Sequence, residues 1–201
     1  MIEKIIKSSI EVKKSLLENK ELHQTIFTIV DVVSKAFQNG NRVMFCGNGG
    51  SAADAQHLAA ELSGRFYKDR KALPSEALHC NTSYLTAVAN DYSYDVIYSR
   101  LIEGIGISGD VLIGLSTSGN SKNIINAFEA AKQIGMTTIA FTGTTGGNAG
   151  GNTEKRGGRI HRNTGGPVDV SKAQDTAGNY KKEHEKIQGI PVSIEVKRGH
   201  D

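Results

Sequence analysis

Two short segments of the chain place glycines or small hydroxyl residues at the start of a helix. The first is Cys-Gly-Asn-Gly-Gly-Ser at 46–51, and the second is Ser-Thr-Ser-Gly-Asn-Ser at 116–121. Glycines let the backbone turn tightly, and a helix start offers unpaired N–H groups with a partial positive charge. Hydroxyls beside such groups can cradle a phosphate without Lys or Arg. We therefore predict an anion site at both segments; the plainer alternatives are an ordinary turn and an ordinary helix N-cap.

The two segments do not match the common nucleotide-binding loops. A dinucleotide fingerprint that begins at Gly47 requires glycine at position 52, where this chain has Ala52. A P-loop requires Gly-Lys-Ser/Thr, which neither segment contains.

A histidine and a glutamate follow the first segment on the same predicted helix. His57 and Glu61 are four residues apart, so their side chains project from one face, which we place one turn beyond the glycines. The pair could share a metal ion or two substrate hydroxyls. Glu61 follows two alanines, and partial burial there would raise its pKa toward the range of a general base. The plainer alternative is an exposed polar pair.

Other polar residues have ordinary roles as the first interpretation. Asn90 and Asp91 stand before a further predicted helix, where an N-cap is the default and contact with a substrate hydroxyl is the alternative. Cys46 and Cys80 are interpreted as small buried residues, because no nearby His or Asn pattern supports a thiol nucleophile.

The elements that must position these residues alternate along the chain. Apolar periodicity predicts helices, and short apolar runs predict strands between them. The predicted helices cover 2–18, 22–38, 51–62, 83–89, 94–105 and 122–134, and the strands cover 42–46, 77–80, 110–115 and 137–141. This alternation predicts an α/β fold, a parallel sheet with helices on both faces, in which ligands bind at the carboxyl ends of the strands.

The composition changes near residue 147. The chain has 201 residues and a net charge of +3, and all of the excess charge lies beyond that point. So small an excess gives no argument for nucleic acid. We expect no membrane span, because no run of 18 apolar residues occurs, and a cytoplasmic protein, because the N-terminus lacks the apolar core of a signal peptide. We divide the chain into N-terminal helices over 1–40, an α/β core over 41–147 and a tail over 148–201, which begins with a loop or disorder over 148–167.

The first 147 residues resemble a known family. The run from Cys46 to Arg65 is similar to the phosphoheptose isomerases of the sugar-isomerase (SIS) domain superfamily. So are the runs at 89–91, 99–100, 109–121 and 141–143. The resemblance implies a flavodoxin-like, three-layer fold with a five-stranded parallel sheet, N-terminal helices that build a homotetramer, and active sites between subunits. It implies conversion of sedoheptulose 7-phosphate into a heptose 7-phosphate through an enediol, toward heptose for lipopolysaccharide or other surface glycans.

The resemblance also implies roles for residues of this chain. Glu61 would be the base, and His57 with Glu61 would be two of the ligands of a zinc ion. The remaining assignments are to the sugar phosphate: Ser116, Thr117, Ser118 and Ser121 would hold the phosphate, and Asn48, Gly49, Gly50, Ser51, Asn90 and Asp91 would contact the sugar.

The resemblance ends in the tail. The family closes with a helix whose Gln and His complete the zinc site and supply the second acid/base group, and no run of the tail matches it. The stretches at 172–184 and 187–195 instead resemble the opening of a phage domain of the inorganic pyrophosphatase-like type, which indicates a fusion or a frameshift; a genuine lineage-specific tail is the alternative. We therefore expect sugar-phosphate binding with impaired isomerisation. The alternative functions are a non-catalytic SIS protein that binds the replication initiator and a sensor of sugar phosphates.

Overall fold

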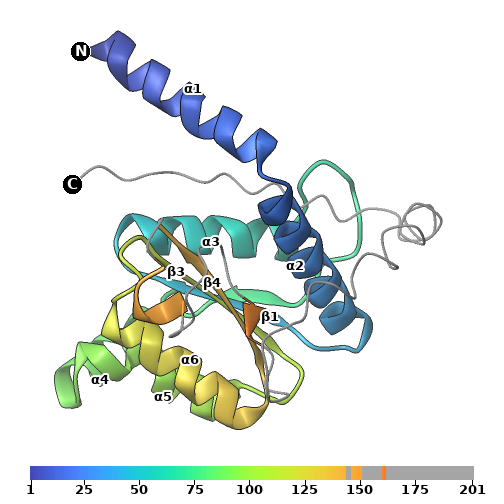
Figure 1. Ribbon diagram of the computed structural model, residues 1–201. Helices are drawn as coiled ribbons and strands as arrows, with labels where there is room; N and C mark the ends of the chain where they lie inside the picture. Colours follow the sequence, from blue (N-terminus) through green and yellow to red (C-terminus); the bar gives the residue numbers. More distant parts are fainter. Residues whose placement is uncertain (144–145, 151–159, 162–201) are drawn as a thin grey trace.

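Four short segments, of which those at 43–47 and 111–116 are continuous apolar runs, form the sheet of the protein (Figure 1). In the computed structural model, which describes residues 1–143, 146–150 and 160–161, they pair as parallel strands. Their order across the sheet is β2 (Ser75–Ala77), β1 (Val43–Gly47), β3 (Val111–Ser116) and β4 (Thr137–Thr142). The short β5 (Ile160–His161) pairs antiparallel with β4. This order is that of flavodoxin-like sheets.

Successive side chains of the central strands point to opposite faces and fill two separate cores. Every residue of β1 and β3 is buried. Met44 and Leu112 face the helices α4 (Thr82–Asp91), α5 (Ile97–Ile105) and α6 (Lys122–Ile134). Phe45 and Ile113 face α2 (Lys20–Gln38) and α3 (Gly50–Ser63). The sheet is therefore the middle of three layers, as the alternation predicts, and Figure 1 shows the helices above and below it.

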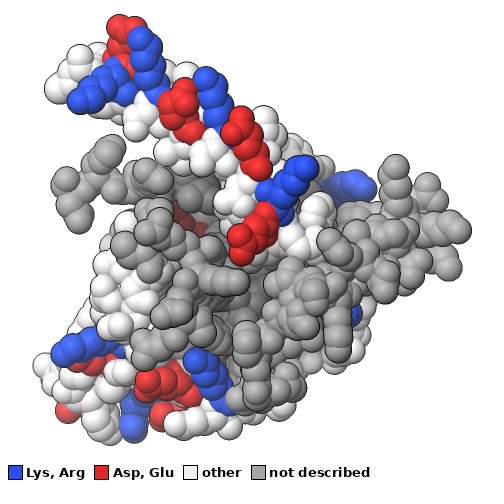
Figure 2. All heavy atoms as spheres, in the orientation of Figure 1, with Lys and Arg blue, Asp and Glu red and all other residues white. Residues whose placement is uncertain are grey.

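The helix α1 (Ile2–Glu18) stands apart from these layers and projects away from the body in Figure 1. None of its residues is buried, although it carries apolar side chains at a helical spacing. The exposed ones include Ile2, Ile5, Ile6, Ile10 and Leu17. Charges of both signs are interspersed along the helix (Figure 2), and some of them form ion pairs, such as Lys7 with Glu3 at 2.7 Å. None of the described helices is long and apolar enough to cross a membrane.

The expected elements appear with small shifts in their bounds. The second helix begins at Lys20 rather than at 22, because the Asn19 side chain accepts a hydrogen bond from the Leu22 N–H at 2.9 Å and caps the helix there. The strand expected at 77–80 is β2, which ends at Ala77. The helix expected over 94–105 opens as the 3₁₀ turn η1 (Tyr94–Val96) before α5.

Two features beyond residue 147 differ from the expectations. A 3₁₀ turn, η2 (Asn148–Gly150), packs on the loop after β3, with Ala149 buried and its N–H bonded to the Gly119 carbonyl at 2.7 Å. The fifth strand is β5, so the loop expected over 148–167 is wrong at Ile160–His161, and a wholly parallel five-stranded sheet is wrong because β5 runs antiparallel. The predictions for the rest of the tail lie outside the described residues.

Candidate functional site

The strand order changes direction between β1 and β3, and we call the switch point outside the carboxyl ends of these two strands the crevice. The chain passes from β1 outward to β2 and then returns to the other side of β1 to form β3. In open α/β sheets the ligand binds at this switch point, outside the carboxyl ends of the strands. The two segments predicted from sequence, 46–51 and 116–121, follow β1 and β3 and therefore flank the crevice.

The helices that begin at this crevice lack side-chain caps. The N-caps of α3 and α6 are Gly49 and Ser121, and neither donates nor accepts a side-chain capping bond. By contrast, α4, which follows the edge strand β2, is capped by Asn81, whose side chain accepts from the Tyr84 N–H at 3.0 Å. The two central helix starts thus keep the partial positive charge that attracts an anion.

Glycine is required at the first loop by close approach of the backbone. A Cβ at Gly47 would lie 2.4 Å from the Ser51 carbonyl oxygen in the first turn of α3. Tyr98, which is buried on α5, donates its hydroxyl to the Gly47 carbonyl from the other side. Burial raises the pKa of that hydroxyl, and the nearby Cys46 thiol raises it further, so Tyr98 remains a neutral donor. We call residues 46–51 the glycine loop. It is therefore fixed both by the close approach of Gly47 to α3 and by the hydrogen bond from Tyr98.

Two of the four hydroxyls of the second loop lie next to each other. The Ser116 and Ser121 hydroxyl oxygens lie 3.0 Å apart, while Thr117 and Ser118 are exposed at the tip. Gly119 has a φ of 67°, and a Cβ there would lie 2.2 Å from the Gly146 carbonyl oxygen. We call the loop 116–121 the hydroxyl loop. Its shape is set by contact with the segment after β4.

The His57 and Glu61 pair forms, but not where it was placed. The His57 Nε2 lies 3.4 Å from the Glu61 Oε1. Because α3 begins at Gly50, a rise of about 1.5 Å per residue puts His57 about 10 Å and Glu61 about 16 Å along the helix. The prediction of one turn is therefore wrong, and α3 carries the pair away from the carboxyl edge of its own sheet.

The pair supplies two ligands of the kind that zinc binds. The Glu61 side chain is 28% exposed, and its Oε2 is buried without a hydrogen-bond partner among the described residues. A buried carboxylate oxygen without a partner fits a metal ligand or a base better than an exposed polar pair. Zinc takes four ligands, and the described part of the chain holds no group of three or more His, Cys, Asp and Glu placed to bind a metal.

The expected cap at Asn90 and Asp91 is wrong. Both residues end α4 instead of opening the next helix, because Asn81 caps α4 nine residues earlier and the helix continues to Asp91. Both are exposed, and the Asn90 Nδ2 donates to the Asp91 Oδ1 at 3.0 Å. Their contact with a substrate stays a prediction.

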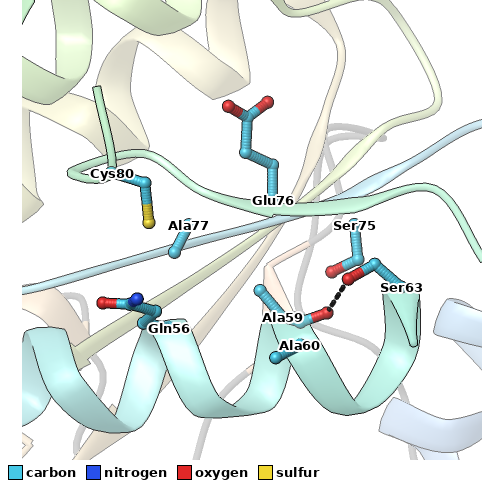
Figure 3. Close-up of a pocket in the computed structure, with 8 residues that line it drawn as sticks. All are labelled: Gln56, Ala59, Ala60, Ser63, Ser75, Glu76, Ala77 and Cys80. Carbon is cyan, nitrogen blue, oxygen red and sulfur yellow. Dashed lines mark hydrogen bonds between the residues drawn. The ribbon is translucent and has the colours of Figure 1, made fainter. Parts of the chain in front are cut away.

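The two cysteines differ in burial. Cys46 is buried in β1, as expected, and burial raises the pKa of its thiol. Cys80 is exposed, contrary to expectation, because β2 is an edge strand that ends three residues earlier. It borders a pocket of about 220 Å³ between α3 and β2 (Figure 3), whose lining also includes Gln56 and Ser63. This pocket lies on another flank of α3 from Glu61, and neither loop of the crevice lines it.

Sequence reasoning missed the residues that support the glycine loop. Asn123, in the first turn of α6, is 3% exposed and bonds to Asn48 across the crevice, and Tyr94 of η1 bonds to the same side chain. An Asn at a helix start is ordinarily a solvated residue or a cap, so its type gave no signal. A spacing of three from Asn120 to Asn123 and Asn126 was the one visible pattern.

Comparisons with known proteins point in one direction. Residues 8–143 match the family model described as the SIS domain. A phosphoheptose isomerase of Clostridium acetobutylicum is 56% identical over 146 residues, which are 73% of this chain and 74% of that protein. Two solved structures with the same fold are phosphoheptose isomerases. The one from Neisseria gonorrhoeae has a TM-score of 0.69 at 38% identity, over 77% of this chain and 79% of that one. The one from Francisella tularensis has a TM-score of 0.72 at 30% identity, over 87% and 89%.

Proposed function

The chain belongs to the SIS domain family, and we propose that it is a phosphoheptose isomerase that converts D-sedoheptulose 7-phosphate into D-glycero-D-manno-heptose 7-phosphate. The observation that carries the proposal is the hydroxyl loop beside an uncapped helix start at the switch point. This arrangement suits a phosphate dianion, because two hydroxyls lie together beside a helix start that carries a partial positive charge. The product would supply heptose for a surface glycan such as lipopolysaccharide.

The phosphate anchors the substrate in the site, and the reaction occurs at C1 and C2, at the other end of the sugar. Ser116, Thr117, Ser118 and Ser121 bind the phosphate, and the glycine loop with Asn90 and Asp91 contacts the hydroxyls. An aldose–ketose isomerase then moves a proton between C1 and C2 through an enediol. Glu61 is the base in this proposal, and the burial of its Oε2 without a partner supports that role.

Distance separates this base from the glycine loop of its own chain, because Glu61 lies about 16 Å along α3 from the helix start. An extended sugar phosphate spans about 10 Å from C1 to phosphorus, since it has roughly eight bonds of about 1.5 Å in zigzag. The family resemblance implies active sites between subunits, and in our proposal the Glu61 of another subunit completes each site. The exposed apolar side of α1 supports assembly into the homotetramer that we propose.

We also propose that His57 and Glu61 hold a zinc ion together with ligands from elsewhere. The fit rests on the adjacent imidazole and the unpartnered carboxylate oxygen. Zinc bound there would act as a Lewis acid and polarise the substrate oxygens near C1 and C2. Metal analysis of purified protein tests this: His57→Ala should lower the bound zinc at least tenfold, whereas His23→Ala, on α2, should leave it unchanged. Equal zinc in both variants would contradict the proposal.

The rate of this chain is a separate prediction. The tail lacks the Gln and His of the closing helix of the family, and general acid–base groups contribute about 10²–10⁴-fold. We therefore expect slow but measurable turnover relative to the C. acetobutylicum relative. The non-catalytic alternatives gain no support from the comparisons, because both solved structures and the relative above are isomerases by name.

The direct test is incubation of purified protein with sedoheptulose 7-phosphate, with the aldose product followed by NMR. Formation of the heptose 7-phosphate above the level of a Glu61→Gln control supports the proposal. No product together with no binding of sugar phosphate would refute it. Normal turnover would refute only the prediction about the tail.

A further inference from the structure

The Asn48 side chain of the glycine loop is joined to α6 by a pair of hydrogen bonds. The Asn48 Nδ2 donates to the Asn123 Oδ1 at 2.9 Å, and the Asn123 Nδ2 donates back to the Asn48 Oδ1 at 2.8 Å. The two residues are 75 positions apart in sequence, Asn48 in the loop after β1 and Asn123 in the first turn of α6. Asn123 is 3% exposed, so this pair is part of the packed structure rather than a surface contact.

A tyrosine adds a third bond to the same carboxamide. The Tyr94 hydroxyl donates to the Asn48 Oδ1 at 3.1 Å. A carboxamide oxygen has two lone pairs and its nitrogen has two N–H donors. The Asn48 oxygen is therefore fully used, by Asn123 and Tyr94, and the nitrogen keeps one N–H.

Tyr94 is itself held in place by α6. The Asn126 Nδ2 donates to the Asp95 carbonyl at 2.9 Å, and the Lys122 ammonium lies 3.7 Å from the Asp95 carboxylate. The turn η1 thus lies across the first turns of α6, and the glycine loop, η1 and α6 form one hydrogen-bonded unit. We call Asn48, Tyr94 and Asn123 the amide clasp.

We propose that Asn123 and Tyr94 are positioning residues that hold the Asn48 carboxamide as a hydrogen-bond donor only, aimed by its one remaining N–H. This inference rests on the proposed function, because it takes Asn48 to be a contact of the sugar. A donor-only amide binds an oxygen that carries negative charge or a free lone pair, such as a sugar carbonyl or an enediolate oxygen. It cannot accept a hydrogen bond from a substrate hydroxyl, so the substrate atom that it meets must offer a lone pair.

Hydrogen–deuterium exchange tests the clasp without any substrate. In Asn123→Leu both bonds to Asn48 are lost, and backbone amides over 47–53 should exchange about 5- to 10-fold faster. The matched control is Asn41→Leu. It removes two comparable bonds, to Ser108 and Asp110, at the opposite end of β1, and should leave exchange over 47–53 unchanged. Equal exchange in the two variants overturns the proposal.

Affinity then tests what the clasp does for the sugar. The ratio of the Kd for inorganic phosphate to the Kd for sedoheptulose 7-phosphate is measured for each protein. A ratio near one for the unchanged protein refutes the proposed function, while exchange still decides the clasp. Where the ratio is large, Asn123→Leu should reduce it about 10-fold and Tyr94→Phe about 3-fold, with the Kd for phosphate itself unchanged. A reduced ratio in Asn41→Leu, or an unchanged ratio in Asn123→Leu, overturns the positioning role.

Discussion

The hydroxyl loop and the His57–Glu61 pair are both rich in polar side chains, yet they differ in completeness. The hydroxyls of Ser116 and Ser121 are partners of each other, and the loop contacts Gly143, Gly146 and Ala149 of the same chain. The pair leaves the Glu61 Oε2 buried without a partner, with no third ligand nearby among the described residues. We therefore propose that one chain contains all the residues of an anion site but only part of a second site.

Our proposal assigns binding to the hydroxyl loop and chemistry to the pair. The hydroxyl loop needs only the start of a helix and the carboxyl end of a strand, which any α/β sheet provides. The pair lies in the second half of α3, about 10 and 16 Å along the helix from its start. We therefore propose that the pair acts on a ligand held by another copy of the chain.

The largest expected effect comes from the pair. Glu61→Gln should reduce the rate of isomerisation by about 10²–10⁴-fold, because the base is lost, while the Kd for sedoheptulose 7-phosphate changes by less than about 3-fold. Rapid sampling of product and titration calorimetry measure the two quantities. Glu129→Gln, an exposed carboxylate on α6, serves as the control and should match the unchanged protein. A large loss of affinity in Glu61→Gln would place the residue in binding instead.

Substitutions in the hydroxyl loop should lower the affinity for the substrate rather than the rate of isomerisation. Ser116→Ala removes a hydroxyl that would bond to a phosphate, and bonds to charged groups contribute about 1.5–3 kcal/mol. The Kd for both inorganic phosphate and the sugar phosphate should therefore rise by about 10- to 100-fold. Ser83→Ala, on the exposed side of α4, should leave both values unchanged. If Ser116→Ala weakened the sugar phosphate but not inorganic phosphate, the phosphate would not be bound there.

A smaller effect separates the two glycines of the crevice. Gly119→Ala combines a φ of 67° with a Cβ 2.2 Å from the Gly146 carbonyl oxygen, so the backbone must shift. Gly49→Ala has a φ of 54° but meets no atom within 4 Å. Strained backbone alone costs about 1–3 kcal/mol, so urea unfolding should show Gly119→Ala to be the less stable variant and Gly49→Ala to remain near the lower figure. Equal stabilities would mean that the contact with Gly146 does not shape the loop.

The sequence alone predicted the local elements well, for a physical reason. The central strands are buried on both faces and appear as continuous apolar runs, and the helices between them repeat every 3.6 residues. The bounds of elements at the edge of the sheet were harder to predict. The strand β2 has one neighbour and three residues, so its bounds and the exposure of Cys80 depend on tertiary packing that no short run encodes.

The sequence predicted which residue types form the candidate site, but not the contacts between residues that are far apart in the chain. The contact of His57 with Glu61 follows from a spacing of four. The clasp joins positions 75 apart, and only the pairing of β1 with β3 brings them together. The end of α4 at Asp91 was not predicted either, because the cap at Asn81 fixes only where the helix begins.

Complementation between subunits tests the central claim, that the base and the phosphate site of one reaction come from different chains. At a substrate concentration well below the Kd of Ser116→Ala, this variant and Glu61→Gln should each have little activity alone, and they are co-expressed with different tags and purified as mixed assemblies. A site that draws one part from each of two subunits is intact in about a quarter of random combinations, so the mixture should recover about a quarter of the activity of the unchanged protein. Activity no greater than the sum of the two separate variants would show that each chain carries its own complete site.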